Sequence, residues 1–159
     1  MSLATAEAIR DRVYTLMEAL AVSGAPKLIR YRNEGGARFD DWAEKNPTAC
    51  LRRFQVREVG DDAPPETTSA SEEYIRLHLE IRIAYPQNHR VGPANAMDRD
   101  DMMNADWSLI NSAIGIYGRA NFSGANDCTP FGATKTREQG AVVDAMVVSA
   151  VFGYFRAVS

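Results

Sequence analysis

Histidine and cysteine are scarce in this chain, with two of each among 159 residues. His78 falls in a segment of strand-like pattern and His89 in a loop, and the sequence places neither near Ser108, Ser112 or Cys128. A serine or cysteine nucleophile needs a base within hydrogen-bonding reach. We therefore predict no catalytic residue, no cofactor and no enzymatic activity, and we interpret both histidines as surface or interface side chains.

The two cysteines, Cys50 and Cys128, lie in unrelated sequence contexts. Neither has a second ligand at the spacing that zinc sites use, so we predict no metal site. In a reducing compartment such cysteines remain thiols, and we expect free thiols rather than a disulfide.

Long apolar runs and excess positive charge are also missing. No stretch approaches the roughly 18 apolar residues of a membrane span, and the start "MSLATAEAIRDR" lacks the pattern of a signal peptide. We expect no membrane association and a protein that stays in the cytoplasm where it is made.

The net charge of −3 argues against tight, general binding to DNA. Hydrophobic residues at 45% and charged residues at 25% are ordinary for a globular protein, and we expect one domain over residues 1–159.

The clearest pattern in the chain is "EEYIRLHLEIRIAYP", from Glu72 to Pro86. Apolar and polar residues alternate there, as in a strand with one buried face and one polar face. The predicted core face carries Ile75, Leu77, Leu79, Ile81, Ile83 and Tyr85. The predicted polar face carries Arg76, His78, Glu80, Arg82 and Ala84.

The remaining elements follow from periodicity and from turn residues. Apolar residues at helical spacing predict helices over residues 4–21 and 98–116. We predict further strands over residues 28–32, 49–59 and 141–158, with a helix as the competing interpretation of the last, and long loops at 60–72 and 118–140. The predicted fold class is α+β, with a mainly antiparallel sheet and two helices packed on it.

Three local features have structural interpretations. The carboxylates in "MDRDD", at Asp98, Asp100 and Asp101, suit the start of a helix better than a calcium loop, because the glycine and the distal glutamate of such loops are missing. Trp107 is expected in the core. An arginine-rich first third is interpreted as a solvated face, with a partner-facing or DNA-facing surface as the alternative; it comprises Arg30, Arg32, Arg38, Arg52, Arg53 and Arg57.

The order of these elements resembles the tail terminator proteins of tailed bacteriophages and related phage-like particles. An amphipathic helix "AEAIRDRVYTLMEAL" is followed by "RFQVREV", an acidic proline-rich loop, "IRLHLEIRIAYP", the helix "DDMMNADWSLINSAI" and the strand "VVSAVFGYFRA". The resemblance covers most of the chain and includes the pair Asp106 and Trp107. The segment 118–140 departs from it, because it is longer and richer in glycine than expected at this place.

The resemblance implies a structural virion protein, assembled in the host cytoplasm and located in the tail and neck. It implies a hexameric ring at the head-proximal end of the tail tube, which ends tube polymerisation and docks to the head-side neck or connector protein. DNA would pass through the lumen without specific binding. Because a ring needs two complementary surfaces on each subunit, we expect Arg76, His78, Glu80 and Arg82 at an intersubunit or lumen surface, and we expect segments 60–72 and 118–140 to contact neighbours.

Other functions remain open at this point. A neck, head-completion or tail-tube protein would use similar α+β modules, since a fold alone does not specify a role. A non-viral module that binds a small molecule would have a closed, largely apolar pocket. A small enzyme would have clustered titratable groups with perturbed pKa values.

Overall fold

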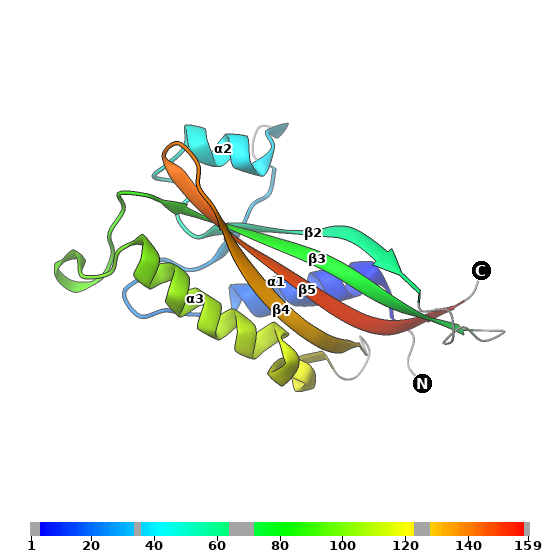
Figure 1. Cartoon of the computed structure of the whole chain (residues 1–159). Coiled ribbons are helices and arrows are strands. Elements are labelled where there is room, and N and C mark those ends of the chain that lie inside the picture. Colours follow the sequence, from blue (N-terminus) through cyan, green and yellow to red (C-terminus); the bar gives the residue numbers. More distant parts are fainter. Residues whose placement is uncertain (1–3, 34–35, 64–71, 123–127, 158–159) are drawn as a thin grey trace.

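A computed structural model describes residues 4–33, 36–63, 72–122 and 128–157 (Figure 1). It contains the α-helices α1 (Ala6–Glu18), α2 (Phe39–Lys45) and α3 (Arg99–Ile114), and the short 3-10 helices η3 (Pro93–Asn95) and η4 (Ile116–Phe122). The strands are β1 (Ile29–Arg30), β2 (Arg53–Asp62), β3 (Glu72–Pro86), β4 (Thr129–Glu138) and β5 (Val143–Ala157).

The five strands form one sheet in the order β1-β2-β3-β5-β4. The short β1 pairs in parallel with β2, and every other pairing is antiparallel. The α+β class with a mainly antiparallel sheet is therefore confirmed. The central ladder joins β3 to β5 without a break, from Glu72 opposite Ala157 to Pro86 opposite Val143.

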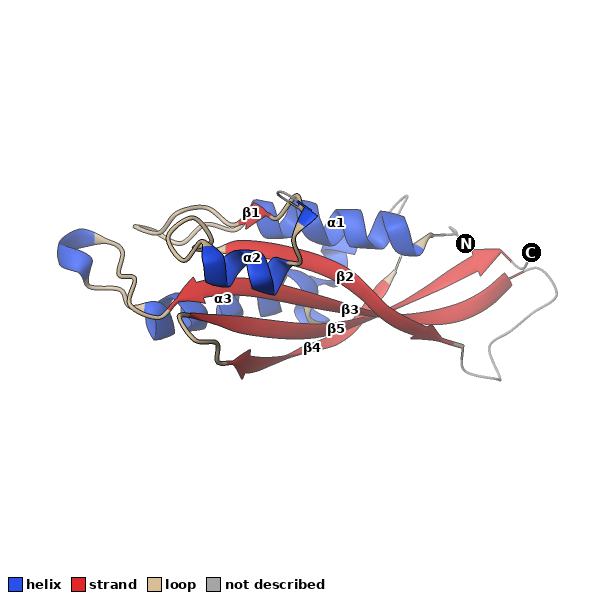
Figure 2. Ribbon diagram, turned by 90° about the horizontal axis from the view of Figure 1, so that it is seen from above, coloured by secondary structure: helices blue, strands red, loops and turns tan. Residues whose placement is uncertain are grey.

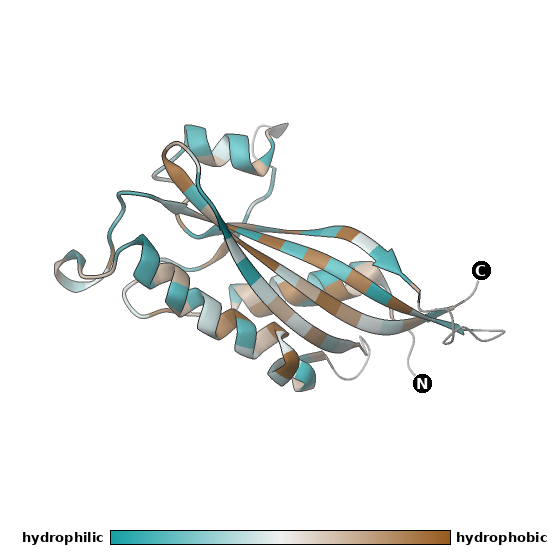
Figure 3. Ribbon diagram, viewed as in Figure 1, coloured by the Kyte–Doolittle hydropathy of each residue, from teal (hydrophilic) through white to brown (hydrophobic). Residues whose placement is uncertain are grey.

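Two helices cover one face of the sheet and a third helix lies on the other (Figure 2). Ile9, Val13 and Met17 of α1 and Ile110 of α3 pack with the odd-numbered side chains of β3 in the main core. That core explains the alternation of hydropathy along β3 (Figure 3), since every second side chain enters it. On the opposite face, α2 packs in a small second cluster against the end of the sheet (Figure 1).

Both predicted helices form, and side chains cap their N-termini. The Thr5 hydroxyl accepts a hydrogen bond from the Ala8 N–H at 3.1 Å, before α1. At α3 the carboxylates of Asp98 and Asp101 each accept a hydrogen bond from the backbone N–H of the other residue, at 3.0 and 3.1 Å. The capping interpretation of "MDRDD" is confirmed.

The sequence-based boundaries fail in the connecting segments. Residues 28–32 contain a strand of only two residues, and α2 had not been expected. The predicted loop 118–140 contains η4 and the ten-residue strand β4. In the predicted loop 60–72, residues 60–62 belong to β2, and residues 64–71 lie outside the described part of the chain. The terminal segment is a strand, as its valines and aromatic residues indicate.

Two side chains differ from the prediction in how deeply they are buried, Trp107 and Arg52. Trp107 is only half-buried and packs at the margin of the main core, with the Lys135 ammonium 5.6 Å from its ring centroid. Arg52 was expected on a solvated face but is fully buried. Among the described residues, no helix is long and apolar enough to cross a membrane.

Candidate interaction face

Within the part of the chain that the structure describes, the second face of the sheet is covered by a helix at one end only. There, Ala84 of β3 and Val143 of β5 are buried in the cluster that contains α2. The part of β3 that is remote from the turn between β4 and β5 extends past α2 (Figures 1 and 2). Tyr74, Arg76, His78 and Glu80 belong to this face of the strand, since they alternate with the core residues. We call this part of the sheet, with the facing positions of the neighbouring strands, the open face. It holds three of the four residues predicted at an interaction surface, namely Arg76, His78 and Glu80.

Arg76 and His78 share one partner on the neighbouring strand β2, the carboxylate of Asp62. The Arg76 guanidinium donates to the Asp62 carboxylate, and the His78 Nε2 lies 3.1 Å from Asp62 Oδ1. These hydrogen bonds, first that from Arg76 and then that from His78, lower the pKa of Asp62. The three side chains are each about half exposed, so the cluster is a solvated charge network on the sheet surface.

Glu80 lies between two arginines. Arg57 of β2 donates from Nε to Glu80 Oε1 at 3.1 Å, and Arg82 Nη1 lies 3.5 Å from the same oxygen. The Glu80 side chain is only 17% exposed, whereas that of Arg57 is 52% exposed. The carboxylate of Glu80 is therefore held inward by cations from two strands.

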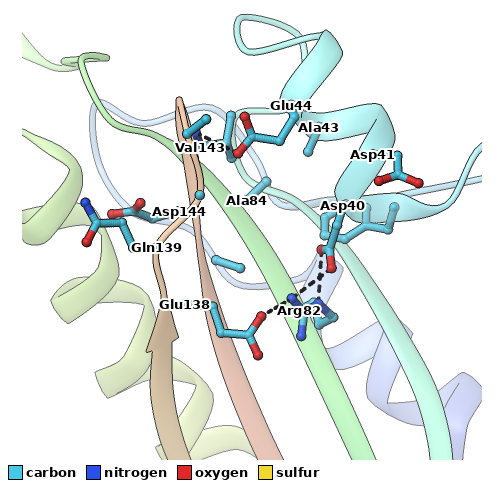
Figure 4. A pocket seen from close by; sticks show the side chains of 14 residues that line it. Asp40, Asp41, Ala43, Glu44, Arg82, Ala84, Glu138, Gln139, Val143 and Asp144 are labelled. Carbon is cyan, nitrogen blue, oxygen red and sulfur yellow. Dashed lines mark hydrogen bonds and ion pairs between the residues drawn. The ribbon is translucent and has the colours of Figure 1, made fainter.

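Arg82 corrects the prediction for this face, because it is a buried residue and not a surface one. Its guanidinium donates from Nε to Asp40 Oδ1 at 3.1 Å and from Nη2 to Asp40 Oδ2 at 3.0 Å, and it also binds Glu138 (Figure 4). Burial alone would lower the pKa of Arg82, but the hydrogen bond that Arg82 donates to Glu138 and the charge of Asp40 outweigh it and raise the pKa. Arg82 thus ties α2 and β4 to the central strand.

A cavity of about 540 Å³ lies between α2 and the turn that joins β4 to β5 (Figure 4). Glu44 of α2 supports its wall, because its carboxylate accepts hydrogen bonds from the N–H groups of Val142 at 3.1 Å and Val143 at 3.3 Å. A Cβ at Gly140 would lie 2.1 Å from Glu44 Oε1, so this contact requires glycine. Asp40 and Glu138 line the cavity, and more than half of each of these side chains is exposed.

Aromatic side chains cover the end of the open face that is remote from α2. The Tyr74 ring lies 5.0 Å from that of Phe155 and 6.4 Å from that of Phe131, in edge-to-face arrangements. A Cβ at Gly153 would come within 1.8 Å of the Tyr74 hydroxyl and 2.3 Å of the Phe131 ring. Gly153 therefore leaves room for Tyr74 and Phe131 above the backbone of β5, and Phe131 remains 50% exposed.

Sequence reasoning missed the partners of Arg82. Asp40 lies on α2 and Glu138 on β4, and neither element was expected from the sequence. The alternation in β3 indicated which side chains share a face, but an alternating pattern carries no information about a helix that packs on that face from elsewhere in the chain.

No protein-family model matches the sequence, and no curated protein is significantly similar to it.

Proposed function

We propose that this protein is a structural subunit of a phage tail, which assembles into a ring at the head-proximal end of the tail tube. The ring ends tube polymerisation and docks to the head-side neck or connector protein. The protein is placed in the virion after assembly in the host cytoplasm, and it performs no catalysis. The α+β fold with a mainly antiparallel sheet is compatible with this proposal, although α2 and β4 add to the order of elements on which the resemblance rests.

The open face is the observation that carries this proposal. A sheet buries its apolar face against helices, and here a second face extends well beyond α2, which packs on one end of it. Half-exposed aromatic rings such as Phe131, next to a solvated charge network, have the composition of a surface that meets another protein.

The charges of the open face suit a lumen through which DNA passes without being held. Tight binding to phosphates requires cations that release their counterions to the nucleic acid. On this face Arg57 is paired with Glu80, while Arg76 and His78 share Asp62. Because Arg57 and Arg76 already have carboxylate partners, and the chain carries a net charge of −3, sequence-independent attraction to DNA is expected to be weak.

The test is the mass and shape of the purified full-length protein, alone and mixed with the tail-tube protein encoded nearby. Light scattering gives the mass, and negative-stain imaging gives the shape. We expect rings with a central hole, or caps at tube ends that shorten the tubes. Tubes whose length and ends are unchanged by an excess of the protein would contradict the terminator role and would favour another neck, head-completion or tail-tube protein.

The cavity beside α2 favours one second candidate, a non-viral module that binds a small molecule. Its volume of about 540 Å³ is within the range of ligand pockets, and it combines the apolar Phe39, Ala84 and Val143 with charged groups at its edge. Native mass spectrometry of the protein as purified tests this function. A stoichiometric bound compound in a stable monomer would support it, whereas rings without added mass would reject it.

A further inference from the structure

Large apolar side chains are exposed at the two opposite edges of the sheet. At the edge formed by β1 and β2, Ile29 is 47% and Val59 is 57% exposed. At the edge formed by β4, Phe131 is 50% exposed. Next to Phe131, a Cβ at Gly132 would lie 3.9 Å from Ile116 of η4, which is itself 63% exposed. The chain therefore presents two different apolar patches, separated by the width of the sheet.

Val59 and Phe131 both lie at β-bulges, and the two bulges are at the same height. The β2 ladder is interrupted between Glu58 and Gly60, which sets Val59 outside the regular pairing. The β4 ladder is interrupted between Pro130 and Gly132, which does the same for Phe131. Gly60 pairs with His78, His78 with Val151, and Val151 with Gly132, so the two bulges lie on one line across the sheet.

Among the described residues, no strand pairs with the outer side of β2 over its second half. The short β1 pairs only with Arg53 and Phe54. At Val56, the Tyr14 hydroxyl bonds the backbone N–H at 2.9 Å and the carbonyl oxygen at 3.0 Å, and so takes the place of a strand. Beyond Val56, β1 has ended. Since neighbouring strands alternate in direction from β2 to β4, a β4 placed against this edge runs antiparallel to β2.

The charges of the two edges disfavour the contact of the β2 edge with itself. The segment Glu58–Asp62 carries three carboxylates and no cation, and each of these side chains is 38% to 48% exposed. Through the strand register this segment lies level with residues 129–133 of β4, which carry no charge. Two copies of the acidic edge would repel each other, whereas a contact with β4 at this height sets no like charges against each other.

We propose that copies of this chain join edge to edge, with β4 of one copy continuing the sheet of the next copy at the second half of β2. Phe131 and Ile116 of one copy then pack against Val59 of its neighbour. This contact is heterologous, because different surfaces meet, and its repetition gives a ring when the rotation between neighbours closes. The inference rests on the proposed function for what the ring does, and it names the surfaces that build it.

Paired cysteine variants test this contact. In a Cys128→Ser background, the exposed residues Val59 and Phe131 are changed singly to cysteine, and Val142→Cys serves as the control. Val142 is 46% exposed but lies in the turn before β5, away from both edges. Circular dichroism checks that each variant folds. Under mild oxidation, or with a short bifunctional maleimide, we expect covalent dimers when Val59→Cys and Phe131→Cys are mixed.

Each variant alone is expected to give at least tenfold less dimer than the mixture, and Val142→Cys is expected to link to neither. A double variant, Val59→Cys with Phe131→Cys, should give a ladder of covalent oligomers that ends at one closed species. Homodimers of either single variant in equal yield to the mixture would overturn the heterologous contact. Links to Val142→Cys in equal yield would overturn the specificity for the edges.

The two proposals fail in different ways. Rings seen by microscopy without a link between positions 59 and 131 would overturn the edge contact and leave the ring function standing. A closed ladder from a protein that never alters tail tubes would support the edge contact and reject the terminator role. A protein that stays monomeric at all concentrations, with and without tubes, would overturn both.

Discussion

Arg52 and Asp106 form an ion pair inside the core, although 54 positions separate them in the chain. Arg52 Nε donates to Asp106 Oδ2 at 3.0 Å, a second guanidinium nitrogen binds the other carboxylate oxygen, and both side chains are fully buried. The Tyr85 hydroxyl donates to Asp106 at 2.7 Å, and burial raises the pKa of Tyr85 well above its usual value. A further guanidinium hydrogen bond goes to the Pro26 carbonyl, so three separate segments meet at Arg52.

Replacement of Asp106 by alanine is expected to destabilise the fold by about 3–5 kcal/mol, because it leaves the Arg52 charge buried without its partner. The measurement is the free energy of unfolding by urea. Asp100→Ala is the matched control: Asp100 also pairs with an arginine, Arg137, at 2.9 Å, but both side chains are about half exposed. For that exposed pair we expect a loss below about 1 kcal/mol.

The double variant Arg52→Met with Asp106→Leu distinguishes the cost of a buried unpaired charge from the contribution of the ion pair itself. An apolar pair leaves no unpaired charge in the interior, so it should recover much of the stability lost in Asp106→Ala. Equal losses for Asp106→Ala and Asp100→Ala would contradict the role assigned to the buried pair.

The link between Arg82 and Glu138 is expected to weaken in acid. The hydrogen bond from Arg82 lowers the pKa of Glu138 below its usual 4.5. A carboxyl with a lowered pKa in the folded state stabilises the fold above its unfolded pKa, and this contribution is lost as pH falls through the folded value. The stability difference between the wild-type protein and Glu138→Gln should therefore stay constant at neutral pH and shrink below pH 4.5. In an Arg82→Met background the same substitution should show little pH dependence, and a difference that persists undiminished in acid would reject this explanation.

The two cysteines should react with thiol reagents at very different rates. Neither is in a disulfide, but Cys50 is buried, and burial raises its pKa to about 11, while Cys128 is half-buried. The thiolate is the reactive form, so at pH 8 iodoacetamide should label Cys128 first and Cys50 slowly. Peptide mass spectrometry follows both sites in the native protein, and Cys128→Ser isolates the slow one. Similar rates at the two sites would show that Cys50 is more accessible than the structure indicates.

Trp107→Ala should cost less stability than Phe122→Ala. Phe122 is 1% exposed, with its ring 4.9 Å from that of Phe152, and loss of such a side chain typically costs about 3–5 kcal/mol. Trp107 is only half-buried, so we expect about 1–3 kcal/mol, in proportion to the smaller area that it buries. Urea titration of both variants ranks them directly, and a larger loss for Trp107→Ala would place the tryptophan deeper in the core.

The parts of the fold that were predicted correctly are those with a strong local pattern. The alternation in β3, the helical stripes of α1 and α3, and the capping residues Asp98 and Asp101 all act within a few positions of one another. The strand β4 was missed because, as an edge strand, most of its side chains are exposed and polar, and a bulge at Gly132 disturbs its period. The helix α2 has only seven residues, too few for a clear helical stripe.

At the candidate interaction face, too, local sequence pattern predicted the grouping of residues but not their burial. Arg76, His78, Glu80 and Arg82 were grouped by their spacing alone, because strand geometry sends every second side chain to one side. Spacing could not tell that α2 and β4 bury Arg82 while Arg76 stays exposed, since burial depends on what packs from distant parts of the chain.

The sequence by itself determined which segments become the long helices and strands, and which side of β3 enters the core, because these depend on interactions between near neighbours. Only the tertiary structure decided that Arg52 pairs with Asp106 in the interior, that Arg82 binds Asp40 and Glu138, and that Val59 and Phe131 lie at equal height on opposite edges. Those relationships join residues that are far apart in the chain, and they arise only when strands are placed in register and helices are packed on them.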